Sequence, residues 1–159
     1  MAERGVRGDL MGEMALARLA LEDMDAAARV HRAAFDDRLC WLSGRHTPAE
    51  DRHYFRDHVF NTCEIWGGAD AEELVGIVAF REGWVDHLYV LPIAQNRGVG
   101  TRLLSVAQTA FPQLSLWTFQ RNTGARRFYE TRGFVVVELT DGAANEEKEP
   151  DVLYRWSRG

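Results

Sequence analysis

The chain has 159 residues, of which 46% are hydrophobic and 27% are charged, and its formal net charge is -5. This length and composition are typical of one folded domain with its own core rather than of a disordered polymer. Nucleic-acid binding is disfavoured as the main role, because neutralising phosphates requires a basic surface. The two cysteines, Cys40 and Cys63, lack the spacing of metal ligands, which indicates a reducing compartment and no metal site.

The N-terminal segment carries no targeting pattern. Residues 1–12 contain no apolar core followed by a small-residue cleavage site, and no apolar run in the chain reaches about 18 residues. We therefore expect a cytoplasmic protein with neither a signal peptide nor a membrane span. The first twelve residues also lack an apolar period, so we expect a frayed N-terminus over 1–12 and a single domain over 13–159.

Hydrophobic periodicity predicts a mixed α/β chain. The clearest helix start is a capping box, in which Thr47 is the N-cap, Pro48 takes the first helical position and Glu50 lies three residues after the cap. In chain order the expected elements are a strand over 14–21, a helix over about 23–35, a helix from 47, strands over 63–67, 73–81 and 84–90, a helix over about 98–110, a strand over 114–119, a helix over 122–133, and strands over 134–139 and 151–156. This order predicts a mixed sheet with helices packed against it.

A glycine-containing turn, QNRGVG at residues 95–100, joins the strand over 84–90 to the next helix. The unpaired N–H groups and the dipole of a helix N-terminus suit an anion such as a phosphate. A plain connection that uses glycine for backbone freedom would explain the same pattern. A P-loop is excluded because its lysine is missing, and the dinucleotide fingerprint is excluded because Leu103 stands where its third glycine belongs.

The string at residues 95–100 resembles the (Q/R)xxGx(G/A) motif of the GNAT superfamily of N-acetyltransferases. It follows a strand that ends in LYVLP, and the block LWTFQRNTGARRFYETRGF resembles the second cofactor motif of that family, with Asn122 at a helix start and Tyr129 seven residues later. The similarity covers about residues 14–158. It implies a GNAT-like α/β fold with a mixed, mostly antiparallel sheet of about seven strands, about four helices, and a splay between the fourth and fifth strands.

The resemblance implies acetyl-CoA as the cofactor, bound where those two strands separate. Its pantetheine arm would pair with the backbone of the strand over 84–90, and its pyrophosphate would lie against the amides of residues 97–101. The side chain of Arg97 either adds positive charge there or is a solvated surface cation. The cofactor-binding residues expected on this basis are Leu88, Tyr89, Val90, Gln95, Arg97, Gly98, Val99, Gly100, Thr101 and Asn122.

Asn122 and Tyr129 are separated by nearly two helical turns and share one helix face. The family pattern implies that Asn122 contacts the pantetheine arm or an ordered water. It also implies that the Tyr129 hydroxyl protonates the departing CoA thiolate. Each residue also has a simpler explanation, because asparagine is a good N-cap and tyrosine is common on the buried face of an amphipathic helix.

An amine acceptor must lose a proton before it attacks the thioester, and Asp86 is the expected general base. Strand alternation places Asp86 on the same face as Leu88 and Val90, beside the expected acetyl group. The alternative is that Asp86 pairs with a neighbouring cation at the end of the strand. His87 points to the opposite face and is therefore a weaker candidate.

Two loops are expected to contribute to the acceptor site, one before the second helix and one before the last strand. The first contains an aromatic residue and a histidine, and the second is acidic and would attract a cationic amine. Ordinary packing and a solvated acidic loop are the simpler explanations. The acceptor-binding candidates are Trp41, His46, Glu146 and Glu147. His53 and His58 differ by about 140° around a helix, which disfavours a metal pair.

Three functions remain open from the sequence. The first is an N-acetyltransferase that moves an acetyl group from acetyl-CoA directly to a primary amine of a small molecule or peptide, through a ternary complex. The second is a non-catalytic acyl-CoA-binding sensor or regulatory module, and the third is an α/β interaction protein with a fortuitous glycine turn. Tyr129 and Asp86 favour the enzyme, because a sensor needs neither residue. We expect no nucleic-acid or membrane partner, and a homodimer remains open.

Overall fold

The computed structural model describes residues 14–159, so the expected frayed segment over 1–12 lies outside the described residues. These residues form a seven-stranded sheet with the order β1-β2-β3-β4-β5-β7-β6. The strands are β1 Ala15–Arg18, β2 Glu64–Asp70, β3 Glu73–Arg81, β4 Trp84–Val90, β5 Gln113–Phe119, β6 Val135–Leu139 and β7 Asp151–Ser157. Neighbouring strands are antiparallel except β4 and β5, which are parallel. The expected mixed, mostly antiparallel sheet is confirmed.

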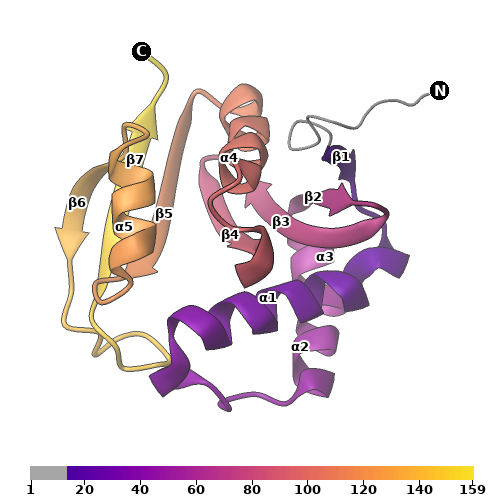
Figure 1. The fold of residues 1–159 in the computed structure, drawn as a ribbon. Coiled ribbons are helices and arrows are strands. Elements are labelled where there is room, and N and C mark those ends of the chain that lie inside the picture. The colour runs from indigo at the N-terminus through magenta and orange to yellow at the C-terminus, as the bar shows by residue number, and fades with distance from the viewer. Residues whose placement is uncertain (1–13) are drawn as a thin grey trace.

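Helices cover both faces of this sheet (Figure 1). They are α1 Met24–Arg38, α2 Pro48–Tyr54, which continues through a π-helical turn over Phe55–Val59 into α3 Phe60–Thr62, α4 Val99–Ala110 and α5 Thr123–Glu130. The capping box of α2 is confirmed, since the Thr47 hydroxyl accepts from the Glu50 amide at 3.1 Å and the Glu50 carboxylate accepts from the Thr47 amide at 2.8 Å. None of the helices in the described part of the chain is both long enough and apolar enough to cross a membrane.

Strand β3 shows how the two layers of core form. Its residues from Val75 to Phe80 are buried without interruption, which is typical of a strand covered on both faces. Ile77 and Ala79 pack with α1 and the π-helical turn, whereas Val78 and Phe80 pack with α4. Tyr129 of α5 packs in the same cluster as Val78 and Phe80. The sheet therefore separates an α1 side from an α4 and α5 side.

The hairpin between β2 and β3 differs from the sequence prediction. The strand over 63–67 was expected to end at Gly67 and the turn to begin at Gly68, but β2 continues to Asp70 and the turn consists of Ala71 and Glu72, both with positive φ. A β-carbon on Gly67 would lie 2.5 Å from a methyl of Leu74, and on Gly68 it would lie equally close to the sulfur of Met14. These glycines are therefore needed for close packing within the strand, not for a turn.

The ends of two other elements also differ from prediction. The first strand ends at Arg18, because the Asp23 carboxylate accepts from the Ala20 amide at 2.8 Å and starts a short 3₁₀ turn before α1. Helix α1 then continues to Arg38 instead of ending near Phe35. This extra turn of helix brings the Arg38 side chain to the cavity described below.

Candidate active site

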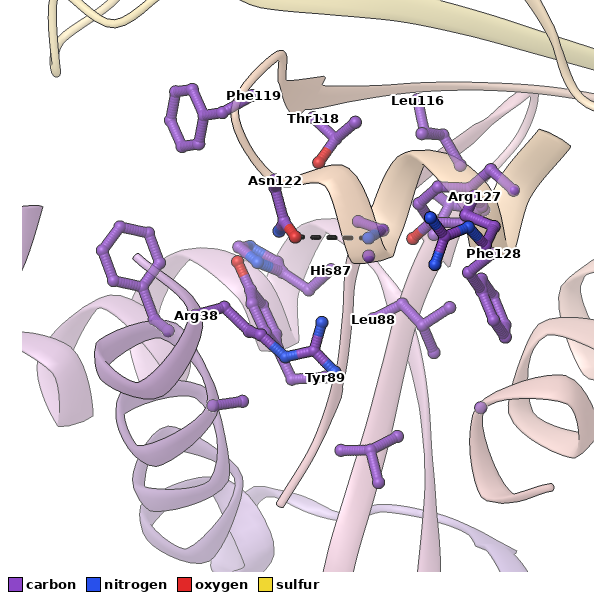
Figure 2. Close-up of a pocket in the computed structure, with 18 of the residues that line it drawn as sticks. Arg38, His87, Leu88, Tyr89, Leu116, Thr118, Phe119, Asn122, Arg127 and Phe128 are labelled. Atoms are coloured by element: carbon purple, nitrogen blue, oxygen red, sulfur yellow. Dashed lines mark hydrogen bonds between the residues drawn. The ribbon is translucent and has the colours of Figure 1, made fainter. Parts of the chain in front are cut away.

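A cavity of about 600 Å³ opens where β4 and β5 separate (Figure 2). The two strands are paired only at Trp84 and Ser115, near their N-terminal ends, which confirms the expected splay. The C-terminal part of α1, the rest of β4, the end of β5 and the first turns of α5 line the opening. The cavity therefore contacts elements from both sides of the sheet.

A β-bulge changes the expected orientation of β4. Val85 pairs with Phe80 and His87 pairs with Ala79, so Asp86 has no partner across the ladder. As a result Val85 packs in the cluster on the α4 side, together with Leu88 and Val90. The expectation that Asp86 shares a face with Leu88 and Val90 is wrong, because the extra residue reverses the alternation at that point.

The Asp86 carboxylate is held by an arginine of the neighbouring strand. Its Oδ2 accepts from Arg81 Nε at 2.7 Å and its Oδ1 accepts from Arg81 Nη2 at 3.1 Å. The Cys63 thiol donates to the same Oδ2 at 3.4 Å, and burial raises the pKa of that thiol to about 11. Asp86 borders the cavity, but the structure shows the alternative considered from the sequence, in which it pairs with a neighbouring cation.

His87 and Tyr89 point toward α1, on the face expected for His87. The two rings lie 5.9 Å apart, and His31 of α1 packs edge-on against Tyr89 at 4.7 Å. His87 Nε2 lies 3.3 Å from the Tyr54 hydroxyl. Burial lowers the pKa of His31 to about 4 and that of His87 to about 3, so both imidazoles are neutral near pH 7. The α1 side of the cavity is thus aromatic and uncharged at these residues.

The glycine turn begins α4 and leaves open space at the N-terminus of that helix. Gly98 is the N-cap of α4 with φ of 83°, a left-handed conformation that favours glycine. No atom lies within 4 Å of the position that a β-carbon on Gly98 would take, so the space above it is open. A β-carbon on Gly100 would lie 3.3 Å from the Phe128 ring of α5. Both glycines are therefore explained physically, one by its backbone angle and the other by close packing.

Only some of the other candidate residues near this turn reach the cavity. The Gln95 side chain donates to the Val90 carbonyl at 3.0 Å, and Arg97 forms an exposed ion pair with Asp70 at 3.3 Å. The backbone of Val99 continues α4 from Gly98. Leu88, Tyr89, Val90, Gln95, Gly100 and Asn122 line the cavity, whereas Arg97, Gly98, Val99 and Thr101 lie outside its lining.

Sequence reasoning missed Arg132, which lies beside the turn. Its guanidinium donates to the Thr101 hydroxyl at 2.7 Å and stacks over Phe128 at 3.8 Å, and it lines the cavity. The signal that could have found it was its position next to Gly133 in the block already singled out. An arginine at this place adds positive charge near the first N–H groups of α4.

Asn122 and Tyr129 lie on α5 on the cavity side (Figure 2 shows Asn122). Asn122 is the N-cap of α5, because its Oδ1 accepts from the Ala125 amide at 3.2 Å. Tyr129 is 8% exposed and packs against Phe128 and Phe134. Burial raises the pKa of Tyr129, so its hydroxyl keeps its proton at neutral pH. No hydrogen bond joins that hydroxyl to another group within residues 14–159.

The two loops expected to form the acceptor site contact each other. His46 Nε2 lies 3.0 Å from the Glu146 carboxylate, and Trp41 Nε1 donates to Glu149 at 3.2 Å. Arg121 stacks on Trp41 at 4.0 Å and pairs with Glu149 at 3.7 Å. These side chains bind the loops together outside the lining of the cavity.

Glu147 is the remaining candidate of the acidic loop. Burial is the main cause that raises the pKa of Tyr89, followed by Tyr129 and Tyr54, and Glu147 adds a smaller contribution. The Glu147 carboxylate is therefore within electrostatic range of a residue that lines the cavity. In residues 14–159, no group of three or more histidine, cysteine or acidic side chains is arranged to hold a metal ion.

The family model of the acetyltransferase (GNAT) family matches residues 21–134. The peptidyl-lysine N-acetyltransferase YiaC of Escherichia coli strain K12 is 32% identical over 84 residues, which are 52% of this chain and 58% of that protein. The match thus spans little more than half the length of this relative. The solution structure of apo YjaB from Escherichia coli has a TM-score of 0.76 at 19% identity, with 92% of this chain and 99% of that chain covered.

The PaiA N-acetyltransferase of Thermoplasma acidophilum, solved in complex with coenzyme A, has a TM-score of 0.72 at 18% identity, with 91% and 98% of the two chains covered. At such identities the two structures establish the fold alone. The chain belongs to the GNAT acetyltransferase family.

The cavity fits acetyl-CoA. The open space above Gly98, the N-terminal amides of α4 and the Arg132 guanidinium form a cradle with the polarity that a pyrophosphate needs. The half-buried residues from Leu88 to Val90 of β4 line the same cavity as Tyr129. The groups present at the cavity therefore suit this cofactor.

Proposed function

We propose that this chain is an N-acetyltransferase that moves an acetyl group from acetyl-CoA to a primary amine of a small molecule or peptide, by direct transfer in a ternary complex. The observation that carries the proposal is the cavity between β4 and β5, which contacts elements on both faces of the sheet and is lined in part by Tyr129. Cofactor and acceptor can then approach the same point from opposite sides, and no enzyme nucleophile is needed.

The cofactor would be held by groups that the sequence largely indicated. The backbone of Leu88 and Val90 pairs with the pantetheine arm as an added strand would, after Gln95 releases the Val90 carbonyl. The N-terminal amides of α4 and the Arg132 guanidinium face the pyrophosphate. When bound, acetyl-CoA supplies an activated acetyl group as a thioester.

Tyr129 would act as the general acid. Its hydroxyl lies in an apolar environment and keeps its proton, because burial raises its pKa. A thiolate that leaves in such an environment is strongly basic, so transfer of the phenolic proton to the sulfur stabilises the departing group. The tyrosinate then regains a proton from water after the products leave.

The proton of the acceptor amine would pass to water in the cavity. Asp86 is a poor base for this step, since its carboxylate is already held by Arg81 through two hydrogen bonds. Both of its oxygens are occupied by the same guanidinium, so neither is directed at an acceptor amine in the cavity. We therefore assign Asp86 to the orientation of water and of the β4 bulge.

The decisive experiment incubates the full chain with acetyl-CoA and a panel of primary amines, and it measures CoA thiol release and the mass gain of one acetyl group on the acceptor. The peptidyl-lysine activity in the name of the YiaC relative justifies lysine-containing peptides in the panel, beside small amines. Acetylated product supports the proposal. CoA binding without any product would support a sensor module instead.

A further inference from the structure

We propose that Arg38 recognises a carboxylate on the acceptor, so that the preferred substrates are amines that also carry a carboxylate, as amino acids do. This inference rests on the proposed function and adds a substrate class to it. The observation behind it is the position of a guanidinium within the acceptor side of the cavity, at a residue that no sequence motif marks.

Arg38 is the last residue of α1, and its side chain extends from that helix into the cavity (Figure 2). Its Nη2 donates to Gln95 Oε1, and its Nη1 lies where any side chain on Gly124 would collide with it. The guanidinium thus crosses from α1 to the turn before α4 and to the start of α5. It is fixed between two elements and is 37% exposed, so one edge remains open to a ligand.

The charge of this guanidinium is weakly compensated. The acceptor of its hydrogen bond is the neutral amide of Gln95, and the nearest carboxylate, Asp37, lies 3.8 Å from its Nε and is itself 48% exposed. Arg32, one turn earlier on α1, is by contrast held by Asp51 at 2.8 Å. Because the ion pair with Asp37 is long and both side chains are partly exposed, an anionic ligand can bind this guanidinium without breaking a short, buried ion pair.

The other charged groups around the cavity divide between its two ends. Arg127 belongs to α5 and Arg132 to the turn that follows it, and Arg132 is bonded to Thr101 beside the N-terminus of α4. Asp86 is neutralised by Arg81. Arg38 is therefore the arginine that reaches the cavity from the α1 side, where the acceptor is expected.

The uncharged surroundings suit the remainder of such a substrate. Phe35, Tyr89 and Phe119 line the same side, and they offer apolar contact to a side chain or a carbon skeleton. Glu147 acts electrostatically on Tyr89, so its carboxylate attracts the ammonium form of the amine, while the Arg38 guanidinium attracts the carboxylate of the substrate. A molecule that carries both an amine and a carboxylate satisfies both charges.

The test compares an amino acid with its carboxamide, using phenylalanine and phenylalaninamide as acceptors for the full chain with acetyl-CoA. For each enzyme form we take the ratio of kcat/KM for the acid to kcat/KM for the amide. The different amine pKa values of the two acceptors cancel when the ratio of Arg38→Gln is divided by the ratio of the wild type. We expect this quotient to fall by about tenfold or more, because a charged hydrogen bond is lost for the acid alone.

Two controls define the outcome. Arg29→Gln removes an exposed arginine of the same helix that does not line the cavity, and it should leave the ratio unchanged. Titration calorimetry of phenylalanine into the CoA-loaded protein should show weaker binding for Arg38→Gln, while the Kd of acetyl-CoA stays within a few-fold. An unchanged acid-to-amide ratio in Arg38→Gln would overturn the inference, and so would an acetyl-CoA Kd that rises as much as the acceptor Kd. If the wild type acetylates no amine at all, the proposed function itself fails.

Discussion

The buried histidine of α1 should make this protein sensitive to mild acid. The His31 ring packs against Tyr89, Phe55 and His87, and its Nδ1 is enclosed without a hydrogen-bond partner among the described residues. Burial lowers its pKa from 6.5 to about 4, while Asp51 and Asp36 partly oppose this effect. In the unfolded chain the same imidazole takes up a proton near pH 6.5.

The sign of the effect follows from proton binding. Between about pH 6.5 and about pH 4 the unfolded state binds more protons than the folded state, so the free energy of unfolding falls as the pH is lowered. Each pH unit across that interval costs about 1.4 kcal/mol. From about pH 7.5 to about pH 5, His31 alone should therefore reduce the stability by roughly 2 kcal/mol.

Urea unfolding at these two pH values measures the loss, and His31→Phe isolates the part that His31 causes. The phenylalanine variant should lose about 2 kcal/mol less than the wild type over the same interval, since its ring cannot be protonated. His53→Phe is the matched control, because the His53 side chain is 79% exposed and its removal should not change the loss. Equal losses in the wild type and His31→Phe would refute the reasoning.

Three further predictions concern the active site. Tyr129→Phe should lower turnover by about a hundredfold or more with the acetyl-CoA Kd within a few-fold, measured by thiol release and calorimetry; unchanged turnover would assign the acid role elsewhere. Gly98→Val and Gly83→Val place a side chain at left-handed glycines with open surroundings, so both should lose about 1–2 kcal/mol in urea unfolding. Only Gly98→Val should weaken acetyl-CoA binding, by more than tenfold, and equal binding by the two variants would reject the pyrophosphate assignment. Asp86→Asn should reduce turnover by less than about tenfold with no rescue at alkaline pH, because its carboxylate already serves Arg81; rescue would restore Asp86 as the base.

The local structure expected on the cofactor side could be predicted because its residues lie close together in the sequence. The turn over 95–101 and the helix start at Asn122 each depend on short-range rules, namely a left-handed glycine and an N-cap asparagine. Such rules act over a few residues and need no knowledge of packing. The resemblance to a known family then linked the two segments to one ligand.

The acceptor side could not be predicted in the same way, because it depends on contacts between distant segments. The bond from Arg38 to Gln95 spans 57 residues, and no local pattern shows that α1 continues far enough to make it. The bulge at Asp86 is equally invisible to a strand rule of strict alternation, since it arises from the register against β3. One extra residue in β4 was enough to turn the expected base away from Leu88.

The acidic loop shows why counting charges in a sequence does not fix the charge of a site. The Glu146 carboxylate contacts His46, and the Glu149 carboxylate pairs with Arg121. Two carboxylates of the acidic loop therefore hold loops together instead of attracting a ligand. Glu147 acts electrostatically on Tyr89 of the cavity, and Arg38 enters the cavity from α1 with the neutral Gln95 amide as its hydrogen-bond partner. The protein as a whole is acidic, yet the cavity is reached by both a guanidinium and the field of a carboxylate. Selection of a substrate that carries both charges follows from that local balance and not from the net charge.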